Sequence, residues 1–152
     1  MLRITFRSHV RTVALFVLVA ASMVGGIVGG QLIRTTQLGS SGLVKVIGVG
    51  VYWDSSCSQA VYSIDWGMVE PGSQKNTSVY IRNEGNTNIT LSLTAENWNP
   101  ENASNYMTLT WDYDNRTLAP NQVIEVTLTL SIQDDVEGIE SFSFTIVIIG
   151  TG

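Results

Sequence analysis

The residue types that most often perform catalysis are scarce in this 152-residue sequence. The single histidine is His9, close to the N-terminus, and the single cysteine is Cys57. Residues 35–152 therefore hold no imidazole to act as a general base, to complete a catalytic triad or to bind zinc. A cysteine without a histidine also lacks the partner of the usual thiol dyad. We therefore predict that this protein is not an enzyme.

Two acidic turns are the remaining candidates for a bound ion. The segment Asp112-Tyr113-Asp114-Asn115 resembles the first half of an oxygen-rich calcium loop, and residues 134–138 form a second acidic turn. Neither segment completes a twelve-residue calcium loop with its terminal glutamate. Solvated hairpin turns explain both segments equally well. We expect no cofactor, with calcium as the open alternative at Asp112, Asp114, Asp134 and Asp135.

Four Asn-x-Ser/Thr sequons are the other sites at which chemistry is expected, in this case covalent modification. They begin at Asn76, Asn88, Asn102 and Asn115. All four follow the N-terminal apolar segment and lie at predicted strand starts or loops, where a glycan has room. These four asparagines are therefore candidate glycosylation sites.

An uncharged run over residues 12–33 is flanked by Arg11 and Arg34. Its length suffices to cross a hydrocarbon core of about 30 Å as a helix. We expect residues 1–34 to form an apolar helix that is either a cleaved signal peptide or a retained transmembrane anchor. In the second case the protein is attached to the membrane through residues 12–33.

The distribution of charge indicates export. Residues 1–45 hold five of the eight Lys and Arg residues and no acid, whereas all 13 Asp and Glu residues follow. A basic start before an apolar run and an acidic remainder predict an extracellular or cell-surface domain. The acidic balance also argues against nucleic acid as a partner. With one cysteine, no intrachain disulfide can form.

Beyond residue 34 the hydrophobic pattern is that of strands. Residues 35–42 (TTQLGSSG), a Gly- and Ser-containing stretch, are expected to be a linker, and residues 43–152 one domain. Apolar and polar residues alternate through most of the domain, which is typical of strands with one buried face. The expected strands cover residues 43–53, 60–65, 75–82, 89–95, 107–111, 124–132 and 142–148.

Strands of this kind need a second sheet against which to bury their apolar faces. About 110 residues with seven strands and no helical period predict an all-β, immunoglobulin-like or jelly-roll antiparallel β-sandwich. The expected first strand differs from the others because its apolar residues lie on both faces. These residues include Val44, Val46, Val49, Val51 and Trp53.

A strand that is apolar on both faces needs neighbours on both sides. It can complete its own domain as an ordinary first strand, or it can enter the sandwich of an adjacent subunit as a donated strand. Repeated donation would give an open head-to-tail filament. Copies of the chain itself are therefore the expected partners.

Four segments resemble those of a known family, namely residues 48–53 (GVGVYW), 63–67 (SIDWG), 69–73 (VEPGS) and 79–86 (VYIRNEGN). The pattern resembles the small exported sandwich subunits of the camelysin/TasA type, including archaeal bundling-pilus proteins. This resemblance implies an apolar leader, a Pro-Gly corner before a long strand, and polymerisation. The zinc protease activity associated with the camelysin name is not implied, because no histidine follows the leader.

Two functions follow as hypotheses. The first is an extracellular structural protein, a subunit of a cell-surface filament, pilus or biofilm-matrix fibre that assembles by donation of its N-terminal strand. The alternative is a monomeric, membrane-anchored immunoglobulin-like domain that serves as a binding module or a stalk. The two differ in the fate of the apolar leader. A polymerising subunit is expected to be freed from it or to exchange strands, whereas an anchored module keeps it and stays closed.

Overall fold

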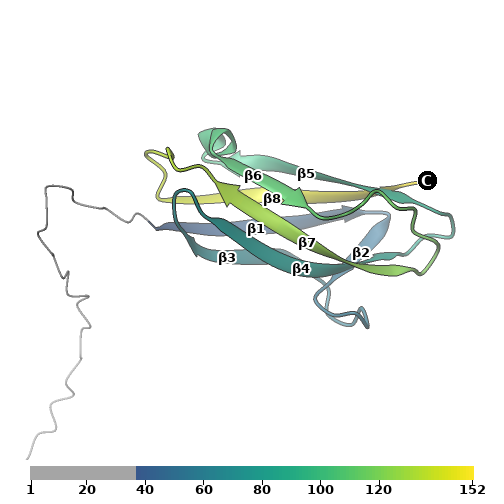
Figure 1. The fold of residues 1–152 in the computed structure, drawn as a ribbon. Helices are drawn as coiled ribbons and strands as arrows, with labels where there is room; N and C mark the ends of the chain where they lie inside the picture. Colours follow the sequence, from purple (N-terminus) through teal and green to yellow (C-terminus); the bar gives the residue numbers. More distant parts are fainter. Residues whose placement is uncertain (1–36) are drawn as a thin grey trace, which may run out of the picture. The chain divides into compact units, whose positions relative to one another are not determined.

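The computed structural model describes residues 37–152 and shows an all-β domain (Figure 1). Eight strands and one short 3-10 helix make up this part of the chain. The elements are β1 (Leu38–Ile47), β2 (Val49–Tyr52), β3 (Ser63–Val69), β4 (Gln74–Asn83), β5 (Thr90–Asn99), η1 (Glu101–Asn105), β6 (Met107–Trp111), β7 (Val123–Ile132) and β8 (Ser141–Thr151).

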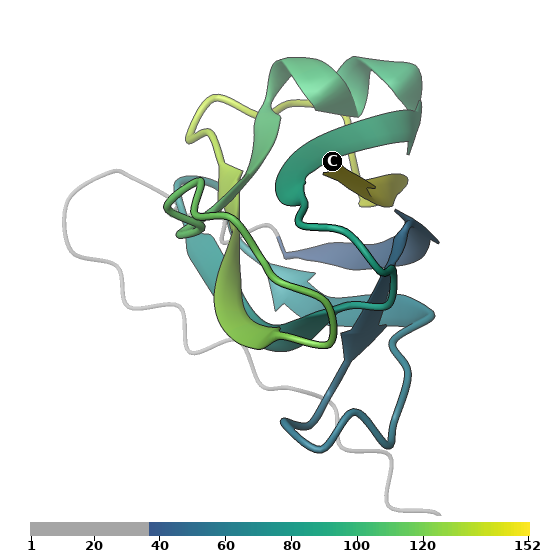
Figure 2. The same cartoon turned by 90° about the vertical axis from the view of Figure 1, so that its right-hand side faces the viewer.

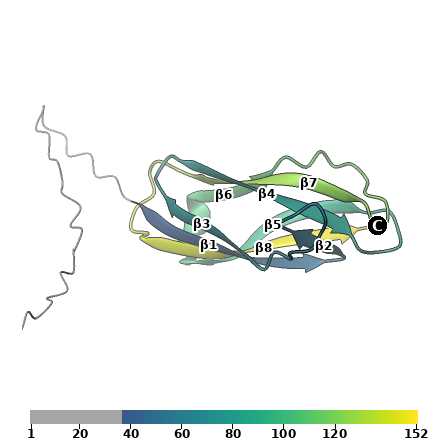
Figure 3. The same ribbon diagram turned by 90° about the horizontal axis from the view of Figure 1, so that it is seen from below.

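The strands form two four-stranded sheets that face each other across one core. The first sheet has the order β3-β1-β8-β5 and the second the order β2-β4-β7-β6. Figure 3 shows the two layers from the side. The fully buried side chains come from both layers, for example Ile64 and Ile146 from the first sheet and Val79 and Leu130 from the second. The fold is therefore a β-sandwich-like arrangement of two sheets.

Strict alternation in the sequence predicts the later strands well. The expected strands over residues 75–82, 107–111, 124–132 and 142–148 match β4, β6, β7 and β8. In β7 the residues Val126, Leu128 and Leu130 are buried while the residues between them are at least partly exposed. This is the result expected when each strand has one side in the core.

The N-terminal part of the domain differs from the prediction. Residues 38–42, expected to belong to a linker, form the first half of β1, and Leu38 is completely buried. The expected single strand over residues 43–53 is two strands, because the chain turns at Gly48 and passes from one sheet to the other. The next strand begins at Ser63 and continues to Val69, so the expected range of 60–65 was also wrong.

The prediction of a purely antiparallel sandwich also needs correction. Strands β1 and β8 run parallel over the pairs from Gly39 with Ser141 to Ile47 with Ile149. The other five pairings between strands of the described part are antiparallel. The expected apolar helix over residues 1–34 lies outside the described residues.

One buried asparagine holds the end of the sandwich where β4 and β7 approach the connecting loops. Asn83 is fully buried, and its side-chain amide donates hydrogen bonds to the carbonyl oxygens of Thr87 (2.7 Å) and Leu118 (3.0 Å). Its side-chain oxygen accepts a hydrogen bond from the backbone N–H of Gly85 at 2.9 Å. All of the polar atoms of this side chain are therefore paired, as a buried amide requires.

Candidate functional site

Strand β1 is the element that the functional hypotheses single out, and it occupies an interior position in its sheet. On one side it pairs with β3, from Leu38 opposite Val69 to Leu43 opposite Ser63. On the other side it pairs with β8 along nine residues. Figure 1 shows β1 beside β8 and β3. Without β1, β3 would have no neighbour in this sheet, so the sheet depends on β1.

The residues of β1 that face the core fit their surroundings closely. Leu38 is completely buried. Ser40 is 8% exposed, and its hydroxyl donates a hydrogen bond to the carbonyl oxygen of Gly67 at 2.9 Å. A Cβ atom added at Gly42 would lie 3.1 Å from Cδ1 of Ile146 and 3.3 Å from Nε1 of Trp66. Gly42 therefore fits beside Trp66, where a residue with a side chain would require its neighbours to shift.

The indole of Trp66 has an additional feature. Its Nε1 atom is buried and has no hydrogen-bond partner among the described residues. The nearest part of β1 is Gly42, which offers no side-chain acceptor. A buried donor without a partner costs roughly 1–3 kcal/mol. At this position β1 and Trp66 are therefore held together by close packing and not by a hydrogen bond to the indole.

The predicted assembly residues fall into two groups. Val49 and Val51 of β2 are buried, and Val44 of β1 packs against the core from the first sheet. Val46 and Trp53 are 38% and 41% exposed. The two apolar faces in the sequence therefore arise from two strands that enter one core from opposite sheets. Only the part up to Ile47 belongs to the first strand.

Gly48 makes the connection between β1 and β2. Its φ angle is +74°, a backbone conformation that glycine adopts without strain and that other residues rarely adopt. It is the single residue between the two strands. A residue with a side chain would be strained at this connection between β1 and β2.

A compact loop follows β2 and projects from the sandwich (Figure 2). The carboxylate of Asp54 accepts hydrogen bonds from the backbone N–H groups of Ser58 (3.1 Å) and Gln59 (2.8 Å) and from the hydroxyl of Ser56. These donors, the Ser56 hydroxyl above all, lower the pKa of Asp54 to about 2. At neutral pH the Asp54 carboxylate is therefore ionised and accepts these hydrogen bonds from within its own loop.

A polar cluster lies beside this loop. The hydroxyl of Tyr52 donates a hydrogen bond to Glu84, and the guanidinium of Arg82 donates to both Tyr52 (3.0 Å) and Glu84 (2.6 Å). The hydrogen bond from Tyr52, followed by that from Arg82, lowers the pKa of Glu84. These hydrogen bonds join Tyr52 of β2 to Arg82 of β4 and to Glu84 just after β4, so the cluster stabilises the β2–β4 pair.

Two of the four aspartates proposed as calcium ligands have partners in the structure, and these contacts are local. Asp112 accepts a hydrogen bond from the backbone N–H of Thr127 at 2.7 Å. Asp114 forms an ion pair with Arg116 at 2.7 Å, which lowers the pKa of its carboxyl group. Asp134 and Asp135 are exposed in the turn between β7 and β8. Residues 37–152 contain no group of three or more Asp, Glu, His or Cys side chains placed to hold a metal ion.

The four sequon asparagines are all exposed, so a glycan can be accommodated at each. Asn76 lies on β4 and Asn102 in η1, while Asn88 and Asn115 lie in connecting segments. Asn115 has a positive φ angle of 61°, which is common for asparagine in turns. Modification at these four positions stays a prediction.

The part of the chain that the structure describes contains the 3-10 helix η1 but no helix long and apolar enough to span a bilayer. The residues expected to do so, 12–33, lie outside it. Two shallow depressions lie near the N-terminal ends of β1 and β8. Their linings consist mostly of small and polar residues, together with Ile139 and Phe142, and Glu140 is the one residue in them with a titratable side chain.

Sequence reasoning missed the residues that anchor β1. Leu38, Ser40 and Gly42 face the core, yet the stretch that contains them has the composition of a flexible connector. The signal that was available is the spacing of two residues through Leu38, Ser40, Gly42 and Val44, which is the period of a strand. The small side chains concealed this period.

The comparisons with known proteins add no family assignment. The chain matches no protein-family model, and no curated protein gives a significant match to it.

Proposed function

We propose that this protein is an extracellular structural subunit that assembles into a cell-surface filament, pilus or biofilm-matrix fibre by exchange of β1. In this assembly the β1 strand of one subunit occupies, in the next subunit, the place between β3 and β8. The observation that carries the proposal is the interior position of a strand that lies at the N-terminal end of the domain. The proposed sandwich is of the immunoglobulin-like or jelly-roll kind.

Three features support exchange of β1 in particular. The strand is joined to the rest of the domain by Gly48 alone, and short connections favour strand exchange between copies. Its pairing with β8 is parallel, so β1 is not the second arm of a local hairpin with β8. Its burial is substantial: a completely buried leucine such as Leu38 contributes roughly 1.5–3 kcal/mol.

The exported location of this subunit rests on the charge pattern of the sequence. The 13 acids all lie after residue 45, and five of the eight basic residues lie before residue 46. The resemblance to camelysin/TasA-type subunits and bundling-pilus proteins agrees with this location and with polymerisation. We expect the partners to be copies of the same chain, with the membrane as a further partner through residues 12–33 if the apolar segment is kept.

The alternative is a monomeric, membrane-anchored domain that serves as a binding module or a stalk. It is favoured by one observation, which is that β1 completes the sheet of its own chain. The two functions differ only in which chain supplies β1. The contacts within the sheet are the same in both.

A cysteine-pairing experiment separates the two functions. A Cβ atom placed on Gly39 lies 3.8 Å from the Cβ of Ser141, a distance typical of disulfides. We expect that chains carrying Gly39→Cys and chains carrying Ser141→Cys, each also with Cys57→Ser, form mixed disulfide dimers when combined and oxidised. Denaturing electrophoresis without reductant measures these dimers.

A matched control tests whether the dimer is specific to this strand pair. Thr108 is exposed on β6 in the other sheet. Chains with Thr108→Cys, also with Cys57→Ser, should therefore give no dimer with Ser141→Cys chains. The opposite outcome is that Gly39→Cys chains also form no dimer with Ser141→Cys chains, while a chain with both cysteines closes an internal disulfide. In that case β1 remains in the sheet of its own chain, and the monomeric alternative is correct.

A further inference from the structure

The outer face of the β1–β3 pair carries an ordered set of exposed side chains. Because strand residues alternate between faces, those next to the buried Leu38, Ser40 and Gly42 point outward. The register places Gly39 opposite Met68, Ser41 opposite Asp65 and Leu43 opposite Ser63. We call the exposed set formed by Met68, Asp65, Leu43, Lys45 and Ile47 the outer stripe.

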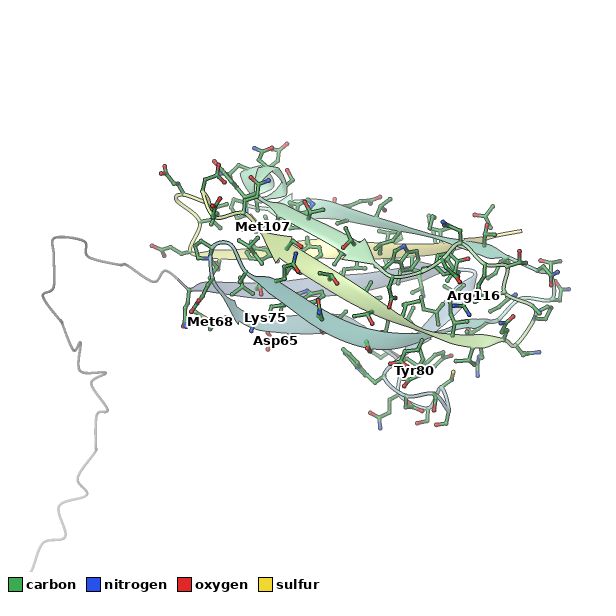
Figure 4. The ribbon with its side chains drawn as sticks, viewed as in Figure 1. Asp65, Met68, Lys75, Tyr80, Met107 and Arg116 are labelled. Carbon is green, nitrogen blue, oxygen red and sulfur yellow. The ribbon has the colours of Figure 1, made fainter. Side chains whose placement is uncertain are left out.

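The outer stripe is unusually apolar for a surface strand. Leu43, Ile47 and Met68 are 60%, 48% and 52% exposed, although each has a large apolar side chain. Figure 4 labels Met68 and Asp65 on β3. Single exposed apolar residues need no explanation, but several along one line on a sheet face indicate a contact surface.

The order of residues in the outer stripe is self-complementary. Along the strand direction it reads apolar (Met68 beside Gly39), acidic (Asp65 beside Ser41), apolar (Leu43), basic (Lys45) and apolar (Ile47). Successive levels are two residues, or about 6.7 Å, apart. Consider a twofold axis that lies in the plane of the face, perpendicular to the strands, at the level of Leu43. Rotation about this axis places Leu43 of the second copy opposite Leu43 of the first, and it places Lys45 of the second copy at the level of Asp65.

We propose that the outer stripe is a docking surface for a second copy of this chain, related to the first by such a twofold axis. Two sheets packed face to face lie about 10 Å apart, a separation that a leucine from each side fills. Lys45 of each copy then meets Asp65 of the other, and Ile47 meets Met68. A twofold interface of this kind repeats every contact, so one complementary pair gives two.

The carboxylate of Asp65 is available for this contact. One of its oxygens accepts a hydrogen bond from the backbone N–H of Gly67 at 2.8 Å, which orients the side chain without neutralising it. The ion pairs that the structure shows among described residues are Arg82–Glu84 and Arg116–Asp114. Neither involves Lys45 or Asp65, so both stripe charges can pair across the interface.

The shape of the face fits the same arrangement. At the Gly39 end of the stripe, the surface has a shallow hollow of about 320 Å³ whose lining includes Gly39, Ser41, Ser141 and Ser143. The twofold axis brings Ile47 of the second copy to this level. The small residues therefore leave room for its side chain.

The four candidate glycosylation sites lie outside the strands that flank the outer stripe. No sequon asparagine belongs to β1, β3 or β8. The interface uses only the outer face of the sheet, whereas exchange of β1 changes which chain supplies the strand. The proposed docking is therefore independent of strand exchange.

Disulfide cross-linking on the twofold axis tests this proposal. The full chain with Cys57→Ser and Leu43→Cys, held in detergent micelles, should cross-link to a dimer faster than a Thr108→Cys chain. Thr108 is likewise exposed, but it lies on β6 in the other sheet. Any dimerisation caused by the apolar N-terminal segment is equal in the two proteins.

Charge reversal then tests the orientation. Adding Lys45→Glu should slow the Leu43→Cys cross-link on the order of tenfold, because two exposed ion pairs become two like-charge contacts. Lys75→Glu, the same charge change at an exposed lysine of β4, should leave the rate unchanged. Combining Lys45→Glu with Asp65→Lys should restore it.

Two results would overturn the docking surface. One is a Leu43→Cys chain that cross-links no faster than the Thr108→Cys chain. The other is a Lys45→Glu chain that behaves like the Lys75→Glu chain, since the face would then meet something other than its own copy. Thermal unfolding of each variant checks that the fold is kept. If the Asp65→Lys chain is unstable, the comparison of Lys45→Glu with Lys75→Glu is a sufficient test of the orientation.

Discussion

At the scale of single residues, the place of β1 in the sheet is set by small side chains. Ser40 reaches a backbone carbonyl of β3, and Gly42 leaves the space that Trp66 and Ile146 fill. A strand of large apolar residues would not fit here, since interiors are packed without spare volume. The fit of β1 is therefore close at Gly42, where even an added Cβ atom would require Ile146 or Trp66 to shift.

Substitution of Gly42 tests this dependence. We expect Gly42→Val to lower the free energy of unfolding by about 1–3 kcal/mol, because the added atoms overfill the space beside Trp66. Urea unfolding followed by tryptophan fluorescence measures the change. Ser41→Val, one residue away on the exposed face, should change stability by less than about 0.5 kcal/mol. Equal effects of the two substitutions would show that Gly42 does not control the fit.

At the scale of elements, β1 is the first strand along the described part of the chain, yet it lies in the interior of its sheet. The strand ends at Ile47, and Gly48 is the single residue before β2 begins. Two ladders and the burial of Leu38 are lost if β1 is removed. The remaining domain then has a gap of the width of one strand.

A strand-replacement experiment follows from this gap. A chain that begins at Gly48 should unfold at a markedly lower urea concentration than one that begins at Gln37. We expect a synthetic peptide of residues 37–47 to restore the midpoint, because it regains both ladders in the same register. The same peptide with Gly42→Val is the matched control and should restore little. Full stability without any peptide would mean that the sheet closes without β1.

The same elements show what could be predicted from the sequence. Strands β4, β6, β7 and β8 were predicted because their apolar residues alternate with polar ones, and this pattern survives without knowledge of the partners. The division of residues 43–53 was not predictable in this way, since one glycine moves the chain between two sheets. The start of β1 was missed because Ser40 and Gly42 make a buried strand resemble a linker.

The predicted assembly residues differ in burial. Val49 and Val51 of the edge strand β2 are buried, and Val44 of the interior strand β1 packs against the core. Val46 and Trp53 are partly exposed, because the ladder between β1 and β3 ends at Leu43 and Trp53 follows the end of β2. Their environment depends on where neighbouring strands stop, which alternation does not reveal.

At the scale of the whole molecule, strand exchange and face-to-face docking would bring copies of the chain together in different ways. Exchange of β1 joins subunits head to tail and extends without closing, whereas the outer stripe joins two faces around a twofold axis. The first gives a filament and the second pairs neighbouring subunits or filaments side by side. Exchange is the central claim, since the protein is a structural polymer only if β1 leaves its own domain.

A locked chain tests the central claim most directly. The double variant Gly39→Cys/Ser141→Cys with Cys57→Ser, oxidised as a dilute monomer, holds β1 beside its own β8. Electron microscopy of the concentrated protein should show no filaments while the disulfide is intact and filaments after a reductant is added. Filaments that form equally well from the locked chain, or no filaments from either form, would contradict assembly by β1.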